Sequence, residues 1–233
     1  MCYNYSAMNL SRYEEIINGE LKERFESFKN LLLSYNNKFN LTAITDEKDI
    51  YMKHFLDCAA GDMFFDEGVS VVEIGSGGGF PSIPLKLIRD DLSFTLIEST
   101  GKKCDYLNAV VDKLNLSCVQ VVNGRAEELG RDRKYREKFD VCTARAVARL
   151  NTLAEYCLPF VKTGGSFIAY KGNCPEEIEE AENALKILGG EIKTVERYEL
   201  PNGESRALVV VKKIKSTPEK YPRGQGKERK NPL

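Results

Sequence analysis

An acidic residue followed by a glycine-rich turn is the segment of this chain with the clearest potential for chemistry. Glu73 stands two residues before the turn 75–79, in which every residue except Ser76 is glycine. Glycine lets a backbone turn tightly and approach a ligand closely, because no Cβ stands in the way. The β-branched run 69–74 predicts a buried strand, and the apolar pattern of 81–89 predicts a helix. Strand, turn and helix together indicate the first βα unit of a nucleotide-binding α/β sheet.

The details of this turn favour a ligand other than NAD. A dinucleotide fingerprint needs a small residue at position 80, where this chain has Phe80. The acid-x-Gly-x-Gly-x-Gly pattern resembles motif I of the S-adenosylmethionine (SAM) methyltransferases, in which the acid lies near the methionine end of the cofactor. A second predicted strand, 93–98, ends in Glu98, 19 residues after Gly79. An acid at that place is expected to accept hydrogen bonds from ribose hydroxyls. The alternative is a simple turn with a surface acid.

Strands and helices alternate after residue 69, which favours a mostly parallel sheet covered on both faces. The further predicted strands are 118–123, 139–144 and 166–171, and the further helices are 102–115, 149–161 and 175–188, with a short turn at 125–129. Two β-like runs, 191–200 and 206–214, follow without a helix between them, and Asn202-Gly203 is a strong hairpin signal. This order resembles the Rossmann-like SAM methyltransferase fold, a seven-stranded mostly parallel sheet with a C-terminal antiparallel hairpin.

Three regions are expected along the chain. Residues 1–65 form an N-terminal helical extension, with one helix over 9–40 and a second over 46–60, for which Asp46 is a good N-cap. Residues 66–214 form the SAM-binding methyltransferase domain, and residues 215–233 form a basic C-terminal tail.

Composition is ordinary for a globular protein, with 233 residues, 42% hydrophobic and 30% charged. No apolar run approaches the roughly 20 residues that span a bilayer, and the N-terminus has no signal-peptide pattern. Seven scattered cysteines without a Cys-x-x-Cys pair, beside a single histidine, argue against a metal site. We therefore expect reduced thiols, a cytoplasmic location and no bound metal.

The tail changes the charge balance of the chain. It carries six basic and two acidic residues, while the whole chain carries −1, so the remainder carries −5. Its prolines and glycines argue against a helix. One interpretation is a solvated, disordered tail. The other is a phosphate-contacting arm with Tyr221 available for stacking, and it makes Arg223, Lys227, Arg229 and Lys230 the candidate RNA-binding residues.

Several motifs together resemble one family, the bacterial small-subunit ribosomal RNA methyltransferase G family, also called glucose-inhibited division protein B. The matching segments are Asn40-Leu-Thr42, Lys53-His-Phe-Leu-Asp57, Gly75-Ser-Gly-Gly-Gly-Phe-Pro-Ser-Ile-Pro84, Arg125-Ala-Glu127, Thr143-Ala-Arg-Ala-Val-Ala-Arg149, Lys220-Tyr-Pro-Arg223 and Lys230-Asn-Pro-Leu233. The Gly-Phe-Pro-x-x-Pro and Thr-Ala-Arg-Ala segments are specific. The family often has Asp at the position of Glu98, and the longer carboxylate is expected to preserve ribose binding.

The resemblance implies a set of site residues. The expected cofactor-binding residues are Glu73, Gly75, Gly77, Phe80, Glu98, Ala126, Glu127 and Arg145. Arg145 and His54 are the expected catalytic residues. His54 and Asp57 are three apart on a predicted helix and share a face, although a packing role for His54 is an open alternative. The basic cluster 131–138 is interpreted as a solvated loop.

The resemblance also implies a reaction, the methylation of guanine N7 in the 530 loop of 16S rRNA by SAM, catalysed by a monomer that acts on 16S rRNA or the small ribosomal subunit. N7 carries a lone pair and no proton, so no general base is needed. Two alternatives are a SAM methyltransferase with a protein or metabolite substrate, and a catalytically silent RNA-binding module. The basic tail favours RNA over a metabolite, and the intact turn with Glu98 argues against lost activity.

Overall fold

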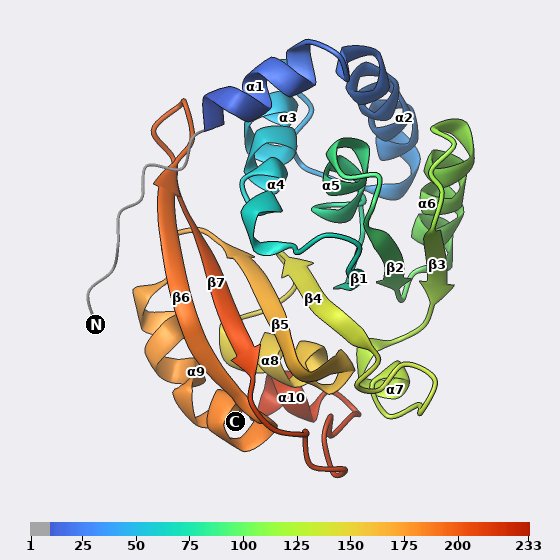
Figure 1. Ribbon diagram of the computed structural model, residues 1–233. Helices are drawn as coiled ribbons and strands as arrows, with labels where there is room; N and C mark the ends of the chain where they lie inside the picture. The colour runs from blue at the N-terminus through green and yellow to red at the C-terminus, as the bar shows by residue number, and fades with distance from the viewer. Residues whose placement is uncertain (1–9) are drawn as a thin grey trace.

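The computed structural model describes residues 10–233, so the first nine residues of the expected extension, Cys2 among them, lie outside the described part. Its centre is a seven-stranded sheet in the order β3-β2-β1-β4-β5-β7-β6 (Figure 1). The strands are β1 Ser70–Ile74, β2 Ser93–Glu98, β3 Val119–Asn123, β4 Phe139–Arg145, β5 Val161–Lys171, β6 Gly190–Glu199 and β7 Ser205–Lys213. Only β7 runs antiparallel to its neighbours β5 and β6. The predicted Rossmann-like methyltransferase sheet is confirmed.

Helices cover both faces of this sheet. They are α5 Ser82–Ile88, α6 Gly101–Lys113, α7 Ala126–Leu129, α8 Leu150–Cys157 and α9 Pro175–Leu188, with a 3-10 turn, η3 Leu158–Phe160, after α8. Successive residues of a strand point to opposite faces. In β1, Val71 therefore joins the core under α5 and α6, whereas Val72 and Ile74 join the core under α8 and α9. Strand β5 begins five residues before its predicted start, because Val161 already pairs with Phe139 of β4. The register then shifts, and regular pairing resumes between Ser166 and Val141.

The N-terminal extension packs on one face of the sheet. The single helix predicted for 9–40 is wrong, because the chain forms α1 Leu10–Asn18 and α2 Lys22–Phe39 with a turn at Gly19, a poor helix former. Phe28, Leu32 and Phe55 belong to the same core as residues of β1 and β2. The extension therefore completes the core on that face.

The second segment of the extension is a helix of changing pitch. Asp46 accepts hydrogen bonds from the backbone N–H groups of Lys48 and Asp49, as predicted for an N-cap. The helix then runs as α3 Glu47–Ile50, a π-helical turn η1 Tyr51–Leu56 and α4 Asp57–Ala59, before the short η2 Asp62–Phe64. π-Helical turns occur mostly as local bulges and frequently at functional sites. Here the wide turn contains His54.

The tail is ordered against the body of the protein. The expectation of no helix is wrong over α10 Lys227–Lys230, which follows Gly226 and packs beside α8 (Figure 1). Tyr221 is buried in the core under α8 and α9, so its ring is not available for base stacking. Within residues 10–233, no helix has both the length and the apolar character needed to cross a bilayer.

Candidate active site

The glycine-rich turn has the backbone geometry that only glycine adopts easily. Gly75, Gly77 and Gly79 all have positive φ angles, of 71°, 49° and 86°. A Cβ on Gly75 would lie 2.8 Å from Cγ2 of Val147, which stands over the turn from the loop after β4. A larger residue at position 75 would therefore meet both strain and a clash.

Glu73 lies fully buried at the start of this turn. Its Oε2 accepts a hydrogen bond from the Ser82 backbone N–H at 3.2 Å. Within the described residues, Oε1 has no hydrogen-bond partner, and neither has the hydroxyl oxygen of the buried Ser76. Burial raises the pKa of Glu73 to about 8. An unpartnered carboxyl oxygen of this kind fits a ligand that brings a cationic or hydrogen-bond-donating group.

Glu98 is fixed beside the same turn by backbone donors. The Gly77 N–H donates to Oε2 at 3.0 Å, and the Thr100 N–H donates to Oε1 at 2.8 Å. The side chain is nearly buried. The predicted alignment of the two acids holds in the structure, because β1 and β2 pair in parallel and both acids lie at their carboxyl ends.

A cavity of about 300 Å³ opens beside the turn, at the carboxyl ends of the parallel strands. Ligands bind at this edge in open α/β sheets. The lining residues are Ile74, Gly75, Ile97, Ser99, Gly124, Arg125, Ala126, Glu127, Val147, Tyr156, Gly226 and Arg229. Gly75, Ala126 and Glu127 from the predicted cofactor set are therefore brought together. The other five members of that set are not among the lining residues: Glu73, Gly77, Phe80, Glu98 and Arg145.

Nine of the twelve lining residues were not among the predicted cofactor-binding residues. Five of them belong to β1, β2 or the loops after β2 and β3, and the other four lie later in the chain: Val147, Tyr156, Gly226 and Arg229. For Tyr156 the sequence does contain a signal, because it lies in the predicted helix 149–161, one face of which is expected to pack on the sheet. Arg229 was assigned to RNA, because a basic residue in a proline-rich tail gives no sign of the cavity that it reaches.

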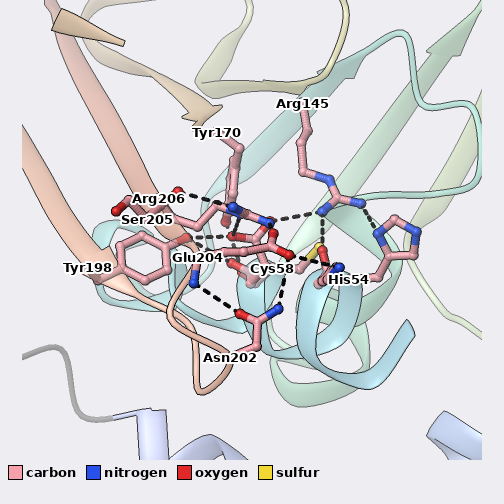
Figure 2. Close-up of polar contacts among 11 residues, drawn as sticks. His54, Cys58, Arg145, Tyr170, Tyr198, Asn202, Glu204, Ser205 and Arg206 are labelled. Atoms are coloured by element: carbon pink, nitrogen blue, oxygen red, sulfur yellow. Dashed lines mark hydrogen bonds and ion pairs between the residues drawn. The ribbon is translucent and has the colours of Figure 1, made fainter. Parts of the chain in front are cut away.

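Arg145 lies in a buried polar network rather than at the cavity (Figure 2). Its Nη1 donates to the Lys53 carbonyl at 2.8 Å and to Oδ2 of Asp57 at 2.9 Å. The guanidinium carbon lies 5.0 Å from the centre of the Phe80 ring. Arg145 thus connects the end of β4 to the helix of the extension and to the glycine-rich turn.

Asp57 is the centre of this network. Besides Arg145, it accepts a hydrogen bond from the Tyr198 hydroxyl at 2.8 Å and lies 3.5 Å from Nε of Arg206. Its side chain is almost inaccessible to solvent, so two cations and a hydroxyl compensate one buried carboxylate. Tyr198 and Arg206 were missed by sequence reasoning, because they lie on β6 and β7, far along the chain.

His54 is held between Arg145 and Thr42. Nη2 of Arg145 lies 2.5 Å from Nδ1, and Oγ1 of Thr42 lies 2.8 Å from Nε2. The ring stacks on Phe80 with 4.2 Å between centroids. Burial, and next the charge of Arg145, lower the pKa of His54 to about 3. An arginine only donates, so Nδ1 is the acceptor and the neutral ring carries its proton on Nε2, toward Thr42.

The four basic tail residues that were assigned to RNA differ in their surroundings. The Arg223 guanidinium pairs with Glu155, with Nη2 2.7 Å from Oε2, so this cation is already compensated within the protein. Lys227 and Lys230 are exposed on α10, and no acid among the described residues forms an ion pair with either. The cluster 131–138 is only partly the solvated loop that was expected, because Arg131 and Arg136 donate to carbonyl groups of the tail.

The comparisons with known proteins agree with the motifs. Residues 21–209 match the family model described as rRNA small subunit methyltransferase G. The chain belongs to this family.

Curated members of the rRNA small subunit methyltransferase G family align over nearly the whole chain. The ribosomal RNA small subunit methyltransferase G of Lactobacillus acidophilus is 43% identical, with 97% of each chain covered. That of Acetivibrio thermocellus is 45% identical, covering 93% of this chain and 90% of the relative.

Solved structures show the same fold at low identity. An O-methyltransferase from Bacillus cereus in complex with SAH is 19% identical, covers 80% of this chain and 91% of its own, and gives a TM-score of 0.57. Aeropyrum pernix fibrillarin with natively bound S-adenosyl-L-methionine is 18% identical, covers 63% and 67%, and gives a TM-score of 0.51. The family member described here therefore has the fold of SAM-dependent methyltransferases.

Proposed function

We propose that this protein transfers a methyl group from SAM to guanine N7 in the 530 loop of 16S rRNA. The observation that carries the proposal is the cavity beside the turn 75–79, in a member of the rRNA small subunit methyltransferase G family. When bound, SAM supplies an activated methyl group on its sulfonium. The protein's part is then to bind, to orient and to exclude water.

We assign different residues around the cavity to different parts of SAM. We assign Glu73 to the cationic methionine end, because its buried Oε1 lacks a partner and a positive group would compensate it. Gly75 leaves room beside Val147, and Gly77 orients Glu98 for the ribose hydroxyls. Ala126 and Glu127 are assigned to the adenine end of the cavity.

Guanine N7 as the acceptor agrees with the state of the only histidine. N7 has a lone pair and no proton to remove, so the reaction needs no base. The Nδ1 lone pair of His54 is occupied by Arg145, and burial keeps the ring neutral. We therefore assign both residues to positioning: they hold Phe80, and with it the turn 75–79, against the helix of the extension.

The site of methylation is tested on the RNA itself. Nucleosides of 16S rRNA from a deletion strain are analysed by mass spectrometry, and the 530 loop is isolated by nuclease protection. We expect 7-methylguanosine to be missing there, to return with the wild-type gene, and to stay missing with Gly75→Val. A 530 loop that keeps its 7-methylguanosine in the deletion strain would contradict the proposal, and a different missing methyl group would indicate another acceptor.

The same proposal includes the working form of the enzyme. We propose that the enzyme is a monomer and that it is cytoplasmic. The location is supported by the six cysteines among the described residues, which are all free, with five of them buried, as in a reducing compartment. Light scattering during size-exclusion chromatography tests the monomer, for which a mass near 26.3 kDa is expected. Fractionation of the cells tests the location.

A further inference from the structure

The tail contributes directly to the cofactor cavity, although it lies beyond the region 21–209 that defines the family. Gly226 and Arg229 line the cavity together with the segment 124–127 and with Tyr156 of α8. The adenine end assigned above therefore has a wall that the methyltransferase sheet and its loops do not supply.

A buried ion pair holds this part of the tail in place. Arg223 donates to Glu155 through Nε at 3.0 Å and through Nη2 at 2.7 Å, and its backbone N–H donates to the same carboxylate at 2.8 Å. The Glu155 side chain is 1% exposed, so three donors converge on a carboxylate out of solvent. This ion pair fixes the position of the tail on α8, because separating the two side chains would leave the Glu155 carboxylate buried without a compensating cation.

Further contacts hold the two sides of this ion pair. Downstream, the Thr152 hydroxyl donates to the Glu228 carbonyl at 3.0 Å, next to Arg229. Upstream, Arg131 donates to the carbonyls of Pro222 and Arg223 at 2.7 Å each. Helix α8 and the loop that carries Arg131 thus determine where Arg229 stands.

Arg229 combines exposure to solvent with a place at the cavity. Its Nη2 lies 3.4 Å from the Val147 carbonyl, a weak contact, and Val147 is the residue that stands over Gly75. Arg229 also forms a hydrogen bond with the side chain of Tyr156. Burial raises the pKa of Tyr156, and the hydrogen bond with Arg229 acts in the opposite direction. A planar guanidinium with five donors can stack on a purine and donate to ribose or ring acceptors.

We propose that Arg229 is a cofactor-binding residue for the adenosyl half of SAM, and that the ion pair of Glu155 with Arg223 is its positioning element. The assignment rests on the proposed function. It replaces the expectation that Arg229 contacts an RNA phosphate, and it leaves Lys227 and Lys230, exposed on the same short helix, for the nucleic acid.

Calorimetry with S-adenosylhomocysteine tests the assignment without any turnover. Arg229→Ala should weaken binding by about three- to tenfold, the usual range for a partly solvated guanidinium contact. Lys230→Ala, which removes the same charge from the neighbouring exposed position, should leave the dissociation constant unchanged. Arg229→Lys should give an intermediate value, because the charge remains and the planar donor set is removed.

The positioning element has its own readout. In the wild type, S-adenosylhomocysteine should slow tryptic cleavage after Lys227, because the ligand holds the tail in the wall of the cavity. The ligand should give no such protection in Arg229→Ala. Glu155→Gln, which keeps the side-chain volume, should speed the cleavage and weaken binding together, and its melting temperature shows whether the fold is retained.

The outcomes separate this assignment from the function on which it rests. If the wild type binds no S-adenosylhomocysteine, the proposed function fails and the assignment fails with it. If the wild type and Arg229→Ala bind equally well, only the assignment is overturned. A loss of rRNA affinity in Arg229→Ala with unchanged ligand affinity also overturns it and returns Arg229 to the phosphate-contacting set.

Discussion

The guanidinium of Arg145 donates from Nη2 to Nδ1 of His54 over 2.5 Å, so the imidazole has no free lone pair. A proton can enter the ring only if the arginine moves away. The folded protein therefore disfavours the charged histidine, and the pKa of His54 falls to about 3, chiefly through burial and then through this cation.

The first prediction is an acid-dependent loss of stability that His54→Gln reduces. The pKa of His54 is 6.5 in a model peptide and about 3 in the fold, so between these values the unfolded chain binds the extra proton. Acidification from pH 7.5 to 5 should then lower the free energy of unfolding of the wild type relative to the variant, approaching about 1.4 kcal/mol per pH unit. Urea unfolding at several pH values measures the difference, and parallel curves for the two proteins would contradict the assigned state.

The same variant tests the reaction. Without a base, the single-turnover rate of methyl transfer should be nearly flat from about pH 6.5 to 9, where an essential base would titrate. Any effect of His54→Gln should be a lower rate at every pH, with the pH–rate profile still flat. A log-linear rise with pH that disappears in His54→Gln would instead indicate an amine or ring-carbon acceptor.

The second prediction concerns Arg145. Arg145→Ala should destabilise the fold by about 3 to 5 kcal/mol, because it removes one of two cations from the buried Asp57. Arg206→Ala is the matched control and should cost less, since its Nε lies 3.5 Å from Asp57. Thermal and urea unfolding measure both. An abolished methyl-transfer rate with unchanged stability in Arg145→Ala would show direct contact with cofactor or RNA.

The third prediction is that Glu73→Gln makes the fold more stable than the wild type toward pH 8 but weakens the binding of SAM. Its pKa is 4.5 in a model peptide and about 8 in the fold, so the unfolded chain releases the proton first as the pH rises. The free energy of unfolding of the wild type should therefore fall, relative to Glu73→Gln, as the pH rises from 4.5 toward 8. Glu73→Gln should nevertheless bind SAM more weakly, which calorimetry measures. Unchanged affinity would remove Glu73 from the cofactor site.

The fourth prediction separates backbone strain from loss of ligand space. Gly75→Val should abolish S-adenosylhomocysteine binding, because the new Cβ would lie 2.8 Å from Val147, and both residues line the cavity that the ligand is proposed to occupy. Gly68→Val is the matched control: its φ of 69° is nearly the same as the 71° of Gly75, but a Cβ there meets nothing within 4 Å. Both variants should be less stable than the wild type, and only Gly75→Val should fail to bind in calorimetry. NAD should bind none of the three proteins.

The fifth prediction concerns the two exposed lysines of α10. Truncation of the tail would also remove buried Tyr221, so the double variant Lys227→Ala/Lys230→Ala is the cleaner change. It should weaken rRNA binding and lower the slope of log K against log salt by about 0.7 to 0.9 for each phosphate that these lysines neutralise in the wild type. Lys186→Ala/Lys193→Ala, with the same change of charge on α9 and β6, is the control. Equal salt slopes in both variants would rule out a role of Lys227 and Lys230 in binding phosphates.

Local patterns predicted the sheet well and the site only in part. Residues 93–98 form a strand between the same two residues as predicted, and Glu73 and Glu98 lie at strand ends as expected. The spacing of His54 and Asp57 correctly indicated a shared face, since both contact Arg145. These features depend on periodicity and short-range geometry, which a sequence displays directly.

Tertiary packing decided the features that were missed. The family resemblance assigned Arg145 to the cofactor, but its hydrogen-bond partners Lys53 and Asp57 lie some 90 positions away along the chain, and no local pattern records them. The tail was judged by its prolines and glycines, whereas Glu155 and Thr152 of α8 determine its fold. The composition of a segment does not indicate which surface it will cover.

The carboxylate of Asp57 also has a consequence for the order in which the molecule assembles. Its partners Arg145 and Tyr198 stand 88 and 141 positions away along the chain. A buried acid is tolerated only once such partners have arrived, so the helix carrying Asp57 gains its full stability after β4 and β6 have docked. Hydrogen exchange should accordingly report the opening of the helix Asp57–Ala59 and of the distant sheet edge as a single cooperative event.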